Sequence, residues 1–366
     1  MLKIAVTGAG GFIGSRVVEM LHLTGFADVV PVSHSVRSLS RSVRFDIEYR
    51  IADGRDPDAL AQAFKSCDVV IDCMLLNPHV MPSAAESVYK AANAAAVRRL
   101  IYLSSASIYG QAPEPGTDET TALSIVQPFP YNAAKIKSER ALNRCRKHGD
   151  TELVILRPGI VTGPRSRWIS NIADELLSTG ARLINGGTGI CNSIYVDNLI
   201  HAMQLCTTAS NIDGEAFIVG DAEQIIWLDL YKAIAAGLNV EMDVVNAAPV
   251  PSKKFSAPDL AEHLRASQPV QTVLPHVPFK LKKAVKSAIA ELKKQDTDAD
   301  QVIAANGAPE LLSAEMSLLQ QCQYKLPNNK AKAVLKYDPP VSFKEGCRRS
   351  LGWLSFAGYP VRPELR

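Results

Sequence analysis

The chain has 366 residues, 47% of them apolar and 21% charged, which is typical of a globular protein with a substantial core, and its net charge of +3 does not indicate nucleic-acid binding. Its seven cysteines are scattered and include no Cys-x-x-Cys pair, which favours reduced thiols over a disulfide framework or a metal site. The sequence enters a predicted strand at once and has no apolar run of transmembrane length, so we expect a cytoplasmic protein. Because no cysteine pair has the spacing of a metal site, we also expect no bound metal.

A glycine-rich loop follows the first predicted strand, at residues 4–6, and leads directly into a helix. A strand that turns sharply into a helix leaves the first N–H groups of the helix free to bind a pyrophosphate, and glycines let the phosphates reach the backbone. This context predicts a dinucleotide site. Its contacts are expected at Gly8, Gly11, Phe12, Ile13 and Gly14, and the apolar face of the helix at Val17, Val18, Leu21 and Leu23.

The second predicted strand, 28–33, ends where a dinucleotide fold contacts the adenosine ribose. An acidic residue there would bond the 2′-hydroxyl and repel a 2′-phosphate, but this chain has Ser33, followed by Arg37, Arg41 and Arg44. Hydroxyl and guanidinium groups suit a phosphate. We therefore predict cofactor contacts from Ser33 and Arg37 and favour NADP, with NAD as the other possibility. The alternative is a solvated basic loop that touches no ligand.

Asp53 ends the third predicted strand, shortly before the helix that Pro57 begins. Its carboxylate either accepts a hydrogen bond from the adenine amino group or caps that helix, and the sequence leaves both roles open.

Apolar strands at 68–73 and 100–104 flank an alanine-rich helix at 83–97. Strands that alternate with helices in this way predict an α/β fold, a doubly wound parallel sheet of the Rossmann type. Ligands of such a sheet bind at the carboxyl ends of its strands.

Candidate catalytic side chains follow the fifth strand. Ser105 and Ser107 come directly after it, and a proline-rich loop then leads to Tyr131 and Lys135 on a helix. Four-residue spacing places the last two on one helical face. A tyrosine with a pKa of about 10 is a poor base, but a neighbouring ammonium lowers that pKa towards neutrality. A serine hydroxyl at the strand end could hold the substrate oxygen beside the phenol.

The sequence resembles the extended short-chain dehydrogenase/reductases, the NAD(P)-dependent epimerase/dehydratase family. The resemblance covers about residues 1–245 and resumes at 326–355. It is carried by Thr-Gly-Ala-Gly-Gly-Phe-Ile-Gly at 7–14, Ser-Ser-Ala-Ser-Ile-Tyr-Gly at 104–110, the pair Tyr131 and Lys135, Arg-Pro-Gly-Ile-Val-Thr-Gly-Pro at 157–164 and Ile-Tyr-Val-Asp-Asn-Leu at 194–199.

The resemblance implies roles for these residues. Tyr131 would be the acid/base, Lys135 would bind the nicotinamide ribose and tune the tyrosine, and Ser105 would complete the triad. Ser107 would lie on the substrate side, and Pro158 near the nicotinamide amide. Family members that use NAD often carry Asp at the position of Ser33, which again favours NADP. The resemblance also implies a small-molecule substrate and a homodimer.

Two domains are expected. Residues 1–165, with 190–222 returning to them, would form the NAD(P)-binding Rossmann domain, and 166–189 with 223–366 a smaller, mostly helical substrate domain. The later elements are predicted as strands at 153–157, 193–196 and 215–220, helices at 168–176 and 227–238, and a helix capped by Asp197.

Residues 247–325 match no family pattern. Within them, 279–294 form a predicted basic amphipathic helix. It could lie on a membrane surface or a partner, but we favour an insertion helix that covers the protein's own substrate cleft.

Two departures from the family pattern bear on the substrate. Nucleotide-sugar members usually carry Asn at the position of Ile160 and Arg at the position of Cys191, and both groups would bind a sugar diphosphate. Their absence, with Ser107 and Ile160 as expected substrate contacts, favours a dehydrogenase or reductase acting on an apolar alcohol or ketone. A nucleotide-sugar epimerase that retains NAD is the alternative. A dehydratase would want an Asp-Glu pair after Ser105, and a non-catalytic cofactor-binding protein is the rival from another class.

Overall fold

The computed structural model describes residues 1–178, 180–242, 244–246 and 312–362. Its contacts separate one unit, residues 1–245 with 318–366, from a second at 246–317. The fold described below is that of the first unit. The basic helix expected at 279–294 lies outside the described residues.

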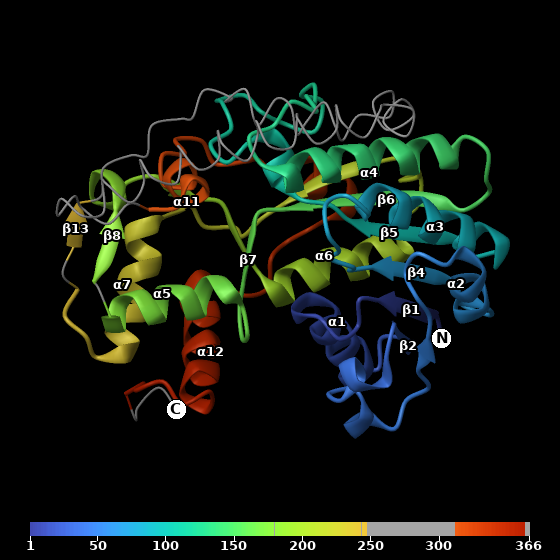
Figure 1. Cartoon of the computed structure of the whole chain (residues 1–366), viewed down its shortest axis with the longest axis horizontal. Coiled ribbons are helices and arrows are strands. Elements are labelled where there is room, and N and C mark those ends of the chain that lie inside the picture. The colour runs from blue at the N-terminus through green and yellow to red at the C-terminus, as the bar shows by residue number, and fades with distance from the viewer. Residues whose placement is uncertain (179, 243, 247–311, 363–366) are drawn as a thin grey trace, which may run out of the picture. The chain divides into compact units, whose positions relative to one another are not determined.

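A seven-stranded sheet forms the centre of this unit, in the order β11-β6-β5-β4-β1-β2-β3 (Figure 1). Every neighbouring pair is parallel, which confirms the predicted Rossmann-type fold. The chain runs from β1 outward to β3 and then crosses to β4 on the other side of β1, so the carboxyl ends of β1 and β4 mark the switch point of the sheet. The strands are β1 (Lys3–Thr7), β2 (Asp28–Ser33), β3 (Arg50–Ile51), β4 (Val69–Asp72), β5 (Arg99–Leu103), β6 (Glu152–Pro158) and β11 (Ala216–Val219).

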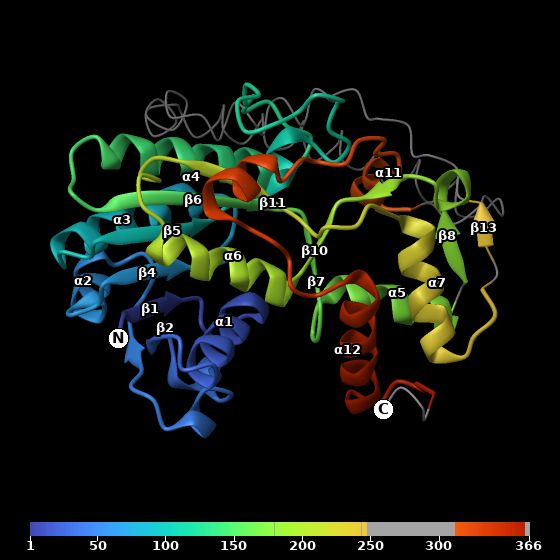
Figure 2. The ribbon, with the colours of Figure 1, turned by 180° about the vertical axis from the view of Figure 1, so that it is seen from behind.

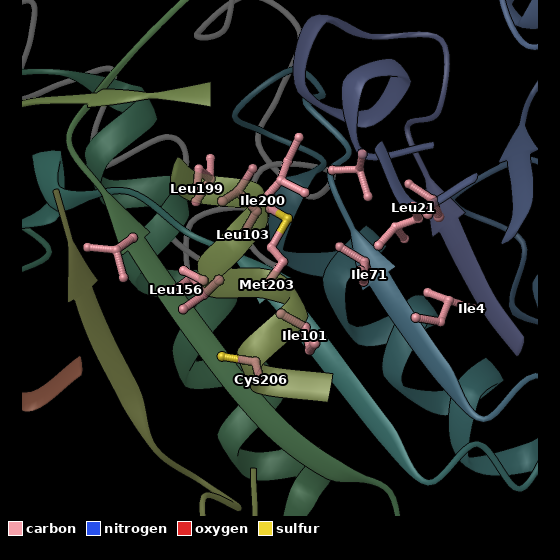
Figure 3. Close-up of a cluster of buried hydrophobic side chains, with 14 of the residues drawn as sticks. Ile4, Leu21, Ile71, Ile101, Leu103, Leu156, Leu199, Ile200, Met203 and Cys206 are labelled. Carbon is pink, nitrogen blue, oxygen red and sulfur yellow. The ribbon is translucent and has the colours of Figure 1, made fainter. Parts of the chain in front are cut away.

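Helices cover both faces of the sheet because alternate side chains of its strands are buried on opposite sides. Ile4, Ile71 and Ile101 point towards α1 (Phe12–Leu23) and α6 (Val196–Thr208), as Figure 3 shows. Strand residues one position away, such as Val70 and Leu100, pack on the other face. That face is covered by α2 (Pro57–Phe64), α3 (Met81–Ala94) and α4 (Pro130–Arg146), and Figure 2 shows α4 and α6 on opposite sides of β5 and β6.

Smaller elements complete the unit beyond β6. The short strands β7 and β10 form a parallel pair, and β9 and β12 an antiparallel pair. Trp168 packs on Trp227 with 6.4 Å between ring centroids, as expected of core residues rather than of a cofactor site. The elements are β7 (Ile160–Thr162), α5 (Arg167–Ser178), β8 (Ala181–Leu183), β9 (Ile190–Cys191), β10 (Ser193–Tyr195), β12 (Ile225–Ile226), α7 (Trp227–Leu238) and α12 (Phe343–Phe356). Two further elements, β13 (Val244–Asn246) and α11 (Ala314–Leu319), each cross the division between the two units. Short helical turns are η1 (Val36–Leu39), η2 (Val43–Phe45), η3 (Ala106–Tyr109), η4 (Ile184–Gly187) and η6 (Ala331–Leu335).

Two local predictions are wrong. Leu23 does not join the buried face of α1 but is 62% exposed, because α1 ends there, two residues before Gly25 adopts a left-handed φ of 62°. Asp197 does not cap α6, which starts one residue earlier with Tyr195 as its N-cap. Its buried carboxylate instead accepts hydrogen bonds from Arg16 at 2.7 Å and Arg349 at 3.0 Å, and so connects α1, α6 and α12.

Among the described residues, every helix is too short or too polar to cross a membrane.

Candidate active site

The glycine loop between β1 and α1 has the backbone geometry that a diphosphate requires. Gly8 has a left-handed φ of 65°, and a Cβ there would lie 2.7 Å from the carbonyl oxygen of Cys73 at the end of β4. A Cβ at Gly14 would collide with the carbonyl oxygen of Gly8. Gly11 is the N-cap of α1 and has no side chain to accept a hydrogen bond. The N–H groups at the start of α1, around Phe12 and Ile13, are therefore not bonded by a capping side chain. The loop therefore fits the pyrophosphate of a dinucleotide.

Serines and exposed arginines lie at the predicted ribose end of the site. Ser33 is buried at the end of β2, and its hydroxyl lies 2.5 Å from that of Ser38. Arg44 is held by Glu19 at 2.6 Å. Arg37 and Arg41 are exposed, and no ion pair is found for either among the described residues. Arg37 thus keeps its guanidinium available beside the carboxyl end of β2, whereas Arg44 does not.

Asp53 does not cap the helix that follows it, so this alternative is wrong. The N-cap of α2 is Asp56, which accepts hydrogen bonds from the N–H groups of Asp58 and Ala59, both at 3.0 Å. Asp53 instead pairs with Arg55 at 2.6 Å, and this hydrogen bond lowers the pKa of its carboxyl to about 2. Its role towards adenine stays a prediction.

Tyr131 and Lys135 lie on one face of α4, as their spacing predicts. The Nζ of Lys135 is 5.9 Å from the centroid of the Tyr131 ring. Lys135 is 3% exposed and donates to the carbonyl oxygen of Leu103 at 2.7 Å and to the hydroxyl of Tyr102 at 3.3 Å. These bonds fasten the first turns of α4 to the end of β5, which is the strand that leads to Ser105.

Burial governs the charge of Lys135. It lowers the pKa of this ammonium to about 8, and the carboxylates of Asp72 and Glu139 oppose the shift. Asp72 ends β4, where it accepts hydrogen bonds from Thr7 at 2.6 Å and from the Met74 N–H at 3.1 Å. Burial raises the pKa of Asp72 in turn. The sequence indicates the buried position of Asp72 in one way: an acidic residue ends an otherwise apolar strand.

Ser105 and Ser107 lie together at the end of β5. Their hydroxyls are 2.9 Å apart, and Ser105 also accepts a hydrogen bond from the N–H of Ser107 at 3.2 Å, which makes it the N-cap of η3. Both residues are partly exposed. Pro158 ends β6, the neighbouring strand, so the predicted catalytic and nicotinamide-side residues share one edge of the sheet with the glycine loop.

A buried charge network behind this edge was not predicted. Glu139, one turn after Lys135 on α4, pairs with Arg157 of β6 at 2.6 Å. Ser104 donates to Glu139 at 2.5 Å, and Arg157 donates to the hydroxyl of Tyr109 at 2.5 Å. The available signals were an arginine inside an apolar strand and a glutamate four residues after Lys135.

Neither position that departs from the family pattern carries a group that would bind a phosphate. Ile160 is half-buried on β7. Cys191 is 1% exposed on β9, and burial raises the pKa of its thiol. Leu326 and Tyr324, from the segment that returns to this unit, pack against Ala106 beside the candidate serine.

Outside this edge, the possible ligand groups are His201 and the other histidine, cysteine and acidic side chains. His201 lies 6.1 Å from the ring of Tyr337, as a packed histidine does. In the part of the chain that the structure describes, no cluster of three or more His, Cys, Asp or Glu residues could hold a metal ion.

Comparisons with known proteins show what the chain is similar to. A family model described as the NAD dependent epimerase/dehydratase family matches residues 4–220. The chain is 22% identical to a 2-alkyl-3-oxoalkanoate reductase of Shewanella oneidensis over 63% of its own length and 65% of the relative, just under two thirds of that protein. It is 25% identical to a UDP-glucose 4-epimerase of Vibrio cholerae, over 65% of this chain and 76% of the relative.

A solved structure has a similar fold. This is the UDP-glucuronic acid 4-epimerase of Bacillus cereus in complex with UDP-glucuronic acid and NAD. It matches with a TM-score of 0.68 and 18% identity, over 97% of this chain and 100% of that one.

Proposed function

The chain belongs to the NAD dependent epimerase/dehydratase family, and on this premise we propose that it is an NAD(P)-dependent oxidoreductase that interconverts an apolar alcohol and its ketone. One observation carries the proposal: the buried Lys135 fastens the helix of Tyr131 to the strand end that carries Ser105, at the same sheet edge as the glycine loop.

The cofactor would be held by backbone groups at one end and side chains at the other. Gly8, Gly11 and Gly14 shape the loop that accepts the pyrophosphate. A bound nicotinamide would supply or accept the hydride at the carbinol carbon of the substrate. We favour NADP because Ser33 stands where an acid would repel a 2′-phosphate and Arg37 is free to bind one.

The chain's own residues would handle the substrate oxygen. In the direction of reduction, Tyr131 donates its hydroxyl proton to the carbonyl oxygen as negative charge develops there, and in oxidation it takes the proton back. Ser105 donates a hydrogen bond to the same oxygen and holds it beside the phenol. Lys135, as an ammonium, stabilises the phenolate that remains after proton transfer.

The preference for reduction or oxidation over epimerisation rests on Cys191 and Ile160. A sugar diphosphate needs cationic and amide donors where it is buried. Cys191 is buried in a β-pair and offers neither, and Ile160 is apolar. The oxoalkanoate reductase among the relatives supports a ketone substrate with alkyl chains, and the UDP-glucose epimerase supports the alternative of a nucleotide sugar with retained NAD.

The test begins with native mass spectrometry of protein purified without added cofactor, followed by fluorescence titration with NADH and NADPH. An empty protein that binds NADPH reversibly and more tightly than NADH is the expected result. Nicotinamide that copurifies with the protein would favour the epimerase, which regenerates its cofactor in place. Binding of neither nucleotide would overturn the enzymatic proposal.

A further inference from the structure

We propose that the buried pair Glu139–Arg157 is a positioning device that holds the turn containing Ser105 in register with the helix containing Tyr131 and Lys135. The inference rests on the proposed function, because it assigns these residues a part in the same reaction. Neither Glu139 nor Arg157 is proposed to touch the substrate.

The pair joins the two elements that flank the site. Glu139 follows Lys135 by one helical turn, so both side chains leave α4 on the same face. The side chains of Glu139 and Arg157 are only 4% and 8% exposed, and two parallel hydrogen bonds join them, at 2.6 and 3.1 Å. Bidentate contacts of this kind fix orientation as well as distance. Because Arg157 immediately precedes Pro158, the pair ties α4 to the end of β6.

The same two side chains hold both ends of the serine turn. Ser104, next to Ser105, donates to Glu139 at 2.5 Å. Tyr109, the last residue of η3, accepts from Arg157 at 2.5 Å. The turn that begins with Ser105 as N-cap is therefore fastened at its start by the carboxylate and at its end by the guanidinium.

Arg157 also connects the turn to a more distant loop. It donates to the carbonyl oxygen of Glu119 at 3.4 Å, while the carboxylate of Glu119 accepts from the N–H of Ile218 on β11 at 2.8 Å. Ile218 packs with Ala106, which lies between the two serines. The ion pair thus links α4, β6 and the loop at Glu119 to the turn, and Glu119 extends the connection to β11.

Stability alone does not account for a buried pair of this kind. Removing both charges from water is unfavourable, and an apolar pair of similar volume is often equally stable or more so. What an apolar pair lacks is the set of directional bonds to Ser104 and Tyr109. Geometry is therefore the property that the pair supplies, and a displacement of about 1 Å at a reacting group can lower a rate about 100-fold.

The experiment compares Glu139→Met, Arg157→Met and the double variant, well below their unfolding temperatures. Single variants leave one buried charge unpaired and should lower the unfolding temperature, whereas the double variant should recover much of it. We expect kcat to fall about 100-fold in the double variant, with the KM for NADPH unchanged. If kcat of the double variant returns towards the wild-type value together with its unfolding temperature, the role of the pair is structural only and the inference is wrong.

Hydrogen exchange provides a readout that needs no turnover. The N–H groups of Ile108 and Gly110 bond within the serine turn, to Ser105 and Ser107. Their exchange should become faster in the double variant and in Ser104→Ala, while the amides of β1 stay protected. Unchanged exchange in the turn would overturn the inference even in a protein without detectable activity.

A matched control uses an ion pair at the opposite edge of the sheet. Arg99, at the amino end of β5, is 2% exposed and pairs with Glu152 at 2.6 Å. Arg99→Met should lower stability without changing kcat.

A wild-type protein that binds NADPH but reduces no substrate contradicts the proposed function, and the exchange measurement then still tests the positioning of the turn.

Discussion

The glycine loop and the catalytic edge adjoin each other but are built in opposite ways. The loop is eight contiguous residues, 7–14, whose geometry depends on the absence of side chains at Gly8 and Gly14. The catalytic edge is assembled from β5, α4 and β6, and buried side chains such as Lys135 and Glu139 hold it together. The loop should thus be sensitive to added atoms, whereas the edge should be sensitive to removed ones.

The largest effect is expected at the edge, from Tyr131→Phe. Without the phenolic hydroxyl, proton transfer to the substrate oxygen is lost, and kcat should fall by about 10³-fold. The dissociation constant for NADPH should stay within error of the wild-type value in a fluorescence titration. A kcat close to that of the wild type would contradict the assigned chemistry.

A second test of the edge concerns the charge of Lys135. Burial lowers its pKa to about 8, while the unfolded chain keeps the proton up to about 10.5. Unfolding therefore takes up a proton between these values, so the free energy of unfolding should rise with pH across this window.

Urea unfolding at pH 7.5 and 10 can measure this effect. Relative to Lys135→Met, the wild-type protein should gain up to about 3 kcal/mol between the two conditions. Lys137→Met, at an exposed position of the same helix, serves as the control and should show no such difference. A pH-independent difference between wild type and Lys135→Met would mean that burial does not discharge the lysine.

The loop is tested by adding one methyl group. In Gly14→Ala, the new Cβ would collide with the backbone of Gly8, so the loop must shift and the affinity for NADPH should fall by more than about tenfold. Because the edge is untouched, kcat at saturating cofactor should change little. Gly352→Ala is the control, since its Cβ would meet open space. Equal effects on affinity and kcat would show that the loop and the edge are not separable.

The smallest effect is expected at the ribose end. Arg37→Ala should weaken NADPH binding by about tenfold, as loss of one charge-assisted hydrogen bond implies, and leave NADH binding unchanged. Arg44→Ala removes an arginine that already pairs with Glu19, so it should change the affinities for NADPH and NADH only slightly and to the same extent. If Arg37→Ala leaves the ratio of the two dissociation constants unchanged, the preference for NADP has another source.

The same contrast explains what the sequence could predict. Strands, helices and the glycine loop follow from local patterns, and the spacing of Tyr131 and Lys135 placed them correctly on one face. The pair Glu139–Arg157 could not be predicted, because its partners are brought together by the packing of α4 on β6. The prediction that Asp197 caps α6 is wrong for the same reason: the partners of its carboxylate, Arg16 and Arg349, are distant in sequence.

The most direct test of the central claim follows the hydride. NADPH that carries deuterium at nicotinamide C4 is incubated with the protein and a panel of apolar ketones, and the products are analysed by mass spectrometry. The account predicts deuterium on the carbinol carbon of an alcohol product, with one oxidised cofactor released for each alcohol formed, and transfer about 10³-fold slower in Tyr131→Phe. Epimerisation of a UDP-sugar without net oxidation of the cofactor, and no transfer to any ketone, would contradict it.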